Sequence, residues 1–210
     1  MMGYDPIESI SNTRQGFEES FEAGPLYDRQ TQDQAHLESI LNCLNIKDNM
    51  KILDLGTGTG YLAFPIADSI FDLVITRYAL HHFPAIHDTF QEIHRVLKPD
   101  GFLFLSDPAP NDEDTDGFID AYMQMKKDGH IKFYTKTEWQ TIGRSAGFKL
   151  THGFETQIRF PRQKQTAIEF EDLIAKFDKQ IIKGYAIKIT DEEIWITERV
   201  NNLLFQKSET

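Results

Sequence analysis

The chain has 210 residues, 40% of them apolar, with a formal net charge of −11 at pH 7. This length suits one compact domain with a substantial core, and the acidic balance argues against a nucleic-acid or anionic-membrane surface, each of which needs a basic footprint. The single cysteine, Cys43, excludes an internal disulfide, and no membrane span or signal peptide is recognisable, so we expect a cytoplasmic protein with a small-molecule partner.

The first 30 residues are polar and contain Gly3, Pro6, Gly16, Gly24 and Pro25. They predict a loosely ordered N-terminal arm or lid at 1–30 ahead of a single domain at 31–210. From Gln32 to Leu44 the apolar residues recur at helical spacing, which predicts an amphipathic helix. Within the domain, we expect 110–200 to form a partly helical region on the substrate side.

The stretch K-I-L-D-L-G-T-G-T-G, residues 51–60, predicts a short buried strand that runs into a tight loop. Gly56, Gly58 and Gly60 lack Cβ, so the backbone can turn sharply there and approach a ligand closely. Such a loop ahead of a helix presents free N–H groups to a polar or anionic group. The stretch therefore predicts a cofactor site, with a plain strand-to-helix turn as the alternative.

A dinucleotide is one candidate cofactor for this loop. Its fingerprint needs a glycine or alanine where this chain has Tyr61, and an acidic residue about 20 positions further on. No acid lies between Asp72 and Asp88. A nicotinamide oxidoreductase is therefore disfavoured.

Helices and strands are expected to alternate after the loop. A short helix, kinked at Pro65, should precede a buried strand at 71–76, a helix at 84–97 and a strand at 102–106. This alternation predicts an α/β fold, a Rossmann-like, mostly parallel sheet with flanking helices.

The second half of the chain is expected to add helical segments to this core. Helices are predicted at 117–127, 137–146 and 166–183, and strands at 148–154 and 203–207. The patterns Thr135 to Glu138 and Thr190 to Glu193 resemble capping boxes, each of which predicts a helix start. The acidic residues from Asp107 to Asp116 are interpreted as a solvated loop in preference to a metal site.

The segment T-R-Y-A-L-H-H-F-P, residues 76–84, follows the second predicted strand. It sits at the carboxyl end of a parallel strand, where open α/β sheets bind ligands. His81 and His82 are either packed, hydrogen-bonded imidazoles or candidate bases, because an imidazole titrates near neutrality. A metal site would need further ligands at a defined spacing, and none is evident.

Three sequence motifs occur in one order along the chain: D-L-G-T-G-T-G, F-D-L-V-I-T-R-Y-A-L-H-H-F, and E-I-H-R-V-L-K-P-D-G with F-L-F-L-S-D. In this order they resemble class I methyltransferases that use S-adenosylmethionine, in the group of the ubiquinone and menaquinone biosynthesis enzymes. The tail D-G-H-I-K-F-Y-T-K-T-E-W is similar to bacterial members of that group. The resemblance implies methyl transfer from S-adenosylmethionine to a small-molecule acceptor.

The resemblance also implies roles for particular residues. The implied cofactor-binding residues are Asp54, Gly56, Thr57, Gly58, Gly60, Arg77 and Tyr78. Asp54 would orient the methionine amino group, the glycine loop would surround the methionine portion, and the backbone of Arg77 would approach the amino group. Tyr78 would lie on the acceptor side with His81 and His82, the candidate catalytic bases if the acceptor must lose a proton.

One departure from the family is large. Only 15 residues, Gly56 to Ile70, separate the first predicted strand from the strand at 71–76, where the family has two more strands that hold the adenosine portion. A connection of that length accommodates one crossover helix, so we expect a sheet shortened at one edge. An exposed edge at Lys51–Leu55 invites pairing with a second molecule, and a homodimer is one option. The alternative function is a catalytically impaired remnant that acts as a binding protein.

Overall fold

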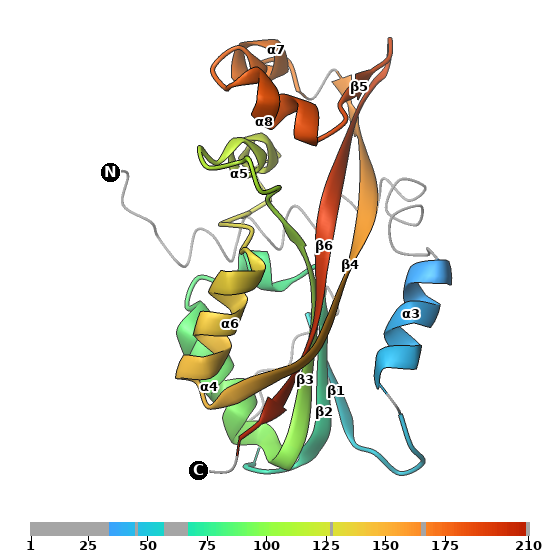
Figure 1. Cartoon of the computed structure of the whole chain (residues 1–210), viewed down its shortest axis with the longest axis vertical. Coiled ribbons are helices and arrows are strands. Elements are labelled where there is room, and N and C mark those ends of the chain that lie inside the picture. The colour runs from blue at the N-terminus through green and yellow to red at the C-terminus, as the bar shows by residue number, and fades with distance from the viewer. Residues whose placement is uncertain (1–33, 45, 57–66, 127, 165–166, 209–210) are drawn as a thin grey trace.

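A computed structural model describes residues 34–44, 46–56, 67–126, 128–164 and 167–208. Within these residues the chain forms one six-stranded sheet with the order β1-β2-β3-β6-β4, in which β5 also pairs with β6. The strands are β1 (Ile52–Leu55), β2 (Phe71–Arg77), β3 (Leu97–Ala109), β4 (Phe148–Gln163), β5 (Lys188–Ile189) and β6 (Glu193–Lys207), as Figure 1 shows.

The sheet combines a parallel half and an antiparallel half. β1, β2 and β3 run parallel, with Leu53 opposite Val74 and Val74 opposite Leu103. β3 pairs antiparallel with β6, and β6 pairs antiparallel with β4 over most of their lengths. Consecutive buried apolar residues in β2 and β3 suit strands that are covered on both faces. The predicted α/β class is confirmed.

Helices cover both faces of this sheet (Figure 1). α3 (Gln34–Leu44) packs Ile40 and Leu44 against Leu73 and Phe104. On the other face lie α4 (Ile86–Val96) and α6 (Lys136–Ser145), whose Phe90 and Trp139 rings stack with centroids 5.7 Å apart. The core of the domain is thus one sheet between two helical layers.

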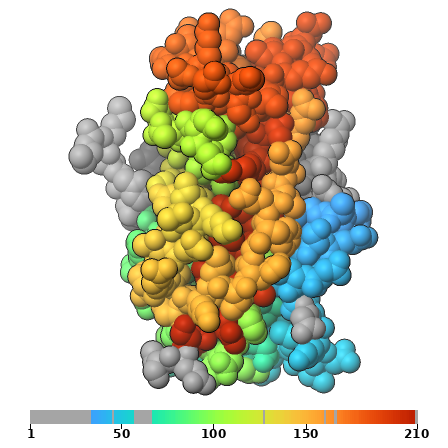
Figure 2. Space-filling view, viewed as in Figure 1, coloured from blue at the N-terminus to red at the C-terminus, as the bar shows by residue number. Residues whose placement is uncertain are grey.

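Three short helices gather at one end of the long β4–β6 ribbon. They are α5 (Phe118–Gln124), α7 (Phe170–Ile174) and α8 (Lys179–Gly184). Their buried aromatic side chains form a second apolar cluster with Ile194 and Ile196 of β6. In Figure 2, α7 and α8 form this end of the molecule, and atoms of β6 are visible between α6 and β4.

Three predicted strands are longer than the sequence pattern suggested, among them the strand predicted at 203–207, which is the end of β6. Leu97, predicted as the last helical residue, instead begins β3, where it lies opposite Phe71. The strand predicted at 148–154 continues to Gln163, because β6 supplies hydrogen-bonding partners along its whole length. Pairing across the sheet therefore set these boundaries.

Two predicted helices are wrong. The helix expected at 166–183 is divided into α7 and α8, because Asp178 adopts an extended backbone and its side chain accepts the N–H of Gln180 at 2.7 Å. The helix expected after Thr190 is the strand β6. Thr190 and Glu193 close the turn between β5 and β6, where the Thr190 N–H donates to the Glu193 carbonyl at 2.8 Å.

β1 forms the edge of the sheet within the described part of the chain and pairs there with β2. The short helix predicted after Gly60 and the arm predicted at 1–30 lie outside the described residues. None of the helices in the described ranges has the length and hydrophobicity of a membrane span.

Candidate functional site

The carboxyl ends of β1 and β2 bring several predicted site residues together. Asp54 is exposed at the end of β1, and partial burial raises the pKa of its carboxyl group. Gly56 follows with φ 90°, and a Cβ placed on it would lie 2.4 Å from the Cβ of Ala79. Only glycine allows so close an approach of the two strand ends. Thr57, Gly58 and Gly60 lie outside the described residues.

Arg77 and Tyr78 stand at the end of β2, beside the end of β1. Tyr78 has φ 54°, a left-handed conformation that is uncommon for a bulky residue. The guanidinium of Arg77 lies 4.5 Å from the centre of its ring. The hydroxyl of Tyr78 lies 3.2 Å from Nδ1 of His36. Backbone strain of this kind concentrates at functional sites.

His36 of α3 connects this site to the sheet, and the sequence analysis missed it. Its Nε2 lies 2.9 Å from Oδ1 of Asn202, an oxygen that also accepts the Ser106 hydroxyl at 2.8 Å. Because an amide oxygen only accepts, Nε2 carries the proton and Nδ1 accepts from the Tyr78 hydroxyl. One histidine on a helix gives no local signal of partners 42 and 166 positions away.

His81 is buried in a short 3-10 helix, η1 (Leu80–His82), and pairs with Asp107. Nδ1 of His81 lies 2.8 Å from Oδ1 of Asp107, and the His81 backbone N–H donates to Oδ2 at 3.1 Å. Burial raises the pKa of Asp107 to about 8 and lowers the pKa of His81 well below its usual value. Burial thus disfavours the charged form of each member of the pair.

Asp107 corrects a prediction. The sequence analysis assigned it to a solvated acidic loop, whereas it is a strand residue of β3 with 1% exposure. The strand runs three residues further than predicted because Asp107, Pro108 and Ala109 lie opposite β6. The loop proper begins after them.

His82 is the more exposed of the two adjacent histidines. Its ring centroid is 4.2 Å from that of His81. Burial is the main cause that lowers the pKa of His82, to about 3, and the electrostatic effect of His81 is the second cause. Both predicted bases are thus neutral imidazoles at neutral pH.

A third histidine lies against this pair. His130, in the loop between α5 and α6, has its ring centroid 5.4 Å from that of His81. Its Nε2 lies 2.8 Å from Oδ1 of Asp120 on α5. The sequence analysis noted the segment D-G-H-I-K-F-Y but assigned His130 no role. No group of three or more His, Cys, Asp or Glu side chains in the described ranges is arranged to hold a metal ion.

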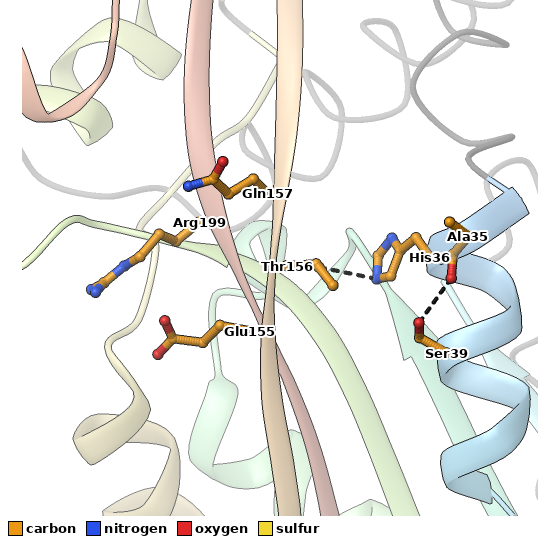
Figure 3. A pocket seen from close by; sticks show the side chains of 7 residues that line it. All are labelled: Ala35, His36, Ser39, Glu155, Thr156, Gln157 and Arg199. Atoms are coloured by element: carbon orange, nitrogen blue, oxygen red, sulfur yellow. Dashed lines mark hydrogen bonds between the residues drawn. The ribbon is translucent and has the colours of Figure 1, made fainter.

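A shallow polar pocket lies elsewhere, at the open edge of β4. Its lining residues are Ala35, His36, Ser39, Glu155, Thr156, Gln157 and Arg199. Figure 3 shows Glu155, Gln157 and Arg199 on one side of the β4–β6 ribbon, and His36 and Ser39 on the other. The pocket wraps around the sheet edge, and none of the predicted site residues lines it.

Comparison with solved structures defines the class of this fold. A crystal structure of a Bacillus halodurans C-125 protein described as a methyltransferase superposes with a TM-score of 0.73 at 20% sequence identity. The superposition covers 83% of this chain and 100% of that one. The chain therefore has the fold of class I S-adenosylmethionine-dependent methyltransferases.

Sequence comparison agrees with this class. Residues 64–153 match the model of a family described as "Methyltransferase domain". The chain is 35% identical over 81 residues to the methyltransferase YcgJ of Bacillus subtilis (strain 168), a match covering 38% of this chain and 32% of that protein. It is 31% identical over 94 residues to YafE of Escherichia coli (strain K12), covering 44% and 45%.

These matches confirm the predicted resemblance to class I methyltransferases. The chain spans less than half the length of these two curated relatives. The narrower grouping with the quinone biosynthesis enzymes stays a prediction.

Proposed function

We propose that the chain transfers a methyl group from S-adenosylmethionine to a small-molecule acceptor. The observation that carries this proposal is the contact between the ends of β1 and β2, where Gly56 leaves no room for a Cβ beside Ala79. Two parallel strand ends held this close expose backbone groups at the edge of the sheet where α/β folds bind ligands. A methyltransferase fold makes the methyl donor the expected ligand.

The site residues are proposed in the roles that the resemblance implies. Asp54 orients the methionine amino group, and Gly56, Thr57, Gly58 and Gly60 surround the methionine portion. The backbone of Arg77 approaches the amino group, and Tyr78 lies on the acceptor side. His81 and His82 face the acceptor. The hydrogen bond from the Tyr78 hydroxyl to His36 supports this placement because it fixes the ring.

The chemistry is an in-line displacement at a sulfonium methyl group. The donor is already activated, so alignment of the two reactants can supply most of the rate enhancement, worth up to about 7–11 kcal/mol. A rigid sheet edge suits this task. The Asp107 contacts to both the side chain and the backbone of His81 hold the acceptor side in place.

The partner and location are proposed from the composition. The charge of −11 favours a small acceptor over nucleic acid, and the single cysteine suits the cytoplasm. We further propose 1–30 as an arm or lid, 31–210 as one domain and 110–200 as its substrate-side region. Pairing of two molecules through β1 remains a proposal.

Calorimetric titration of mass-verified protein with S-adenosylmethionine and S-adenosylhomocysteine tests the function. We expect micromolar binding, and we expect Asp54→Asn to weaken it roughly tenfold or more, because a hydrogen bond to a charged group is lost. Asp191→Asn, an exposed acid in the turn before β6, is the matched control and should bind normally. A folded protein that binds neither compound would favour the alternative function, a non-catalytic binding protein.

A further inference from the structure

His130 and Asp120 form an oriented pair that neither the sequence motifs nor the proposed function assigns. Nε2 of His130 lies 2.8 Å from Oδ1 of Asp120, and that oxygen also accepts the backbone N–H of Phe133 at 2.8 Å. The side chain of His130 is fully buried, while that of Asp120 is 24% exposed. The pair therefore lies just beneath the surface, with its carboxylate toward solvent.

The partners of this pair define the tautomer of the imidazole. Because the Asp120 oxygen accepts, Nε2 carries the proton, and Nδ1 of the neutral ring carries a lone pair. Nδ1 is buried and has no hydrogen-bond partner among the residues that the structure describes. A buried acceptor without a donor costs free energy, so Nδ1 is suited to a donor from a ligand.

The position of the pair matches the acceptor side of the proposed reaction. The loop that carries His130 closes over the segment after β2, where the Ile131 N–H donates to the His81 carbonyl at 3.0 Å. The His130 ring centroid lies 5.4 Å from that of His81 and 6.2 Å from that of His82. All three histidines thus converge at the carboxyl end of β2.

His130 is a third histidine that can accept a proton, beside the two predicted from the sequence. Nδ1 of His81 is already engaged by Asp107 at 2.8 Å. Burial and the neighbouring His81 hold the pKa of His82 at about 3, which makes its imidazole a weak base. His130 has a carboxylate on the opposite ring nitrogen, the arrangement that orients a base and stabilises its protonated form.

Charged and titratable groups surround His130 from several elements. They are Asp120 of α5, Asp107 of β3, His81 and His82 after β2, and Lys126 and Asp128 of the loop. Glu198 of β6 lies behind them, near Asp107 and Asp120. The His130 backbone N–H donates to Asp128 at 3.2 Å. Contacts to Asp120 and Asp128 thus hold both the ring and the backbone of His130 in place.

We propose that His130, oriented by Asp120, is the general base of the methyl transfer, and that the acceptor is a small molecule with a hydroxyl or amine hydrogen. This inference rests on the proposed function. The acceptor oxygen or nitrogen bonds to the methyl carbon while the carbon–sulfur bond breaks and its electron pair stays on sulfur. The acceptor proton passes to Nδ1 of His130, which later releases it to water.

Label transfer tests this base and requires no purified acceptor. Full-length protein is given S-adenosylmethionine with a tritiated methyl group and the small-molecule fraction of a cell extract. We expect His130→Gln to lower the rate about a hundredfold or more with unchanged affinity for S-adenosylhomocysteine. The same substitution at His152, an exposed residue of β4, should leave the rate unchanged.

The pH profile separates a base from a structural residue. Because a general base must be unprotonated to act, the wild-type rate should fall toward low pH, and His130→Gln should lack that dependence. Asp120→Asn keeps an oxygen for the Phe133 N–H but loses the charge, so we expect a loss of roughly tenfold. If His130→Gln does not fold, an unchanged rate and profile in Asp120→Asn overturn the proposal.

The remaining outcomes separate a failure of the general-base assignment from a failure of the proposed methyltransferase function. Wild-type rates in a folded His130→Gln variant overturn the base assignment and leave the methyltransferase function intact. Cofactor binding without label transfer by the wild type overturns the assignment of a protic small-molecule acceptor. A wild type that neither binds the cofactor nor transfers label overturns both proposals.

Discussion

Two residues at the ends of β1 and β2 have backbones that few side chains tolerate. Gly56 has φ 90° and faces Ala79, and Tyr78 has φ 54° while its hydroxyl is bonded to His36. A glycine without Cβ tolerates the first position at no steric cost. The second position holds a bulky residue in a strained conformation, which the His36 and Arg77 contacts offset. The backbone shape of the candidate site therefore depends on these two single residues.

Gly56→Ala tests this requirement. The new Cβ would combine a left-handed backbone with a 2.4 Å contact to Ala79, so we expect a loss of about 2–4 kcal/mol in the free energy of unfolding. Gly117→Ala is the matched control, because Gly117 has φ 78° with nothing within 4 Å of its Cβ position. It should cost about 1–2 kcal/mol. Equal losses in urea unfolding would show that the Ala79 contact is unimportant.

At the scale of the element, α6 begins where its local sequence directs. Thr135 accepts the Glu138 N–H at 3.2 Å, and Glu138 accepts the Thr135 N–H at 2.8 Å, which completes the predicted capping box. The similar pattern from Thr190 to Glu193 forms a comparable hydrogen bond at 2.9 Å but no helix. Pairing of the following residues with β4 made them a strand. A local cap therefore starts a helix only where tertiary pairing permits.

Thr135→Ala should lower the free energy of unfolding by about 0.5–2 kcal/mol, because two backbone N–H groups at the start of α6 lose their partners or orientation. Thr137→Ala is the control on the same helix, since Thr137 is exposed and lies beyond the cap. It should leave stability unchanged or slightly raised, as alanine favours helix. Denaturant titration measures both variants. A loss in Thr137→Ala as large as in Thr135→Ala would contradict the assignment.

At the scale of the whole molecule, the ionisable side chains of Glu198 and Arg162 are buried on the β4–β6 ribbon near α5. Glu198 of β6 has 0% exposure, and its carboxyl oxygens have no hydrogen-bond partner among the described residues. Burial raises the pKa of Glu198 to about 8, while the nearby Lys126 and Arg162 oppose the shift. Arg162 donates to the Tyr122 carbonyl at 2.8 Å. The interior therefore keeps Glu198 neutral at neutral pH.

Stability should consequently fall as the pH rises toward 8. The folded pKa of Glu198 lies above its unfolded value, so its neutral form stabilises the fold at low pH, and this contribution is lost between pH 4.5 and about 8. The slope reaches about 1.4 kcal/mol per pH unit for one group. The raised pKa of Asp107 likewise makes stability fall as the pH rises. The lowered pKa values of His81 and His82 have the opposite effect, since they make stability rise with pH below pH 6.5.

Glu198→Gln isolates this contribution, since the other groups remain. Between pH 6.5 and 8, we expect thermal unfolding of the wild type to lose more stability than that of the variant. Glu192→Gln removes an exposed carboxylate in the turn before β6 and should keep the wild-type pH dependence. Identical slopes for the wild type and Glu198→Gln would refute a carboxyl group kept neutral by burial.

The sequence by itself determined the parallel strands, the helices α3, α4 and α6, and the close turn at Gly56. Periodic burial, caps and glycine requirements are properties of short segments, so they are readable from residue types alone. The ordered motifs likewise indicated the resemblance to methyltransferases. Each of these features depends on neighbours within a few positions or on a short pattern.

Only the tertiary structure decided the partners that complete the site. Asp107 lies 26 positions from His81, and His36 lies 166 positions from Asn202. The β4–β6 ribbon decided that a predicted helix became a strand and that Glu198 became buried. These outcomes depend on which distant segments pair and in which register, and no short segment carries that information. The fold placed His130 beside His81 for the same reason.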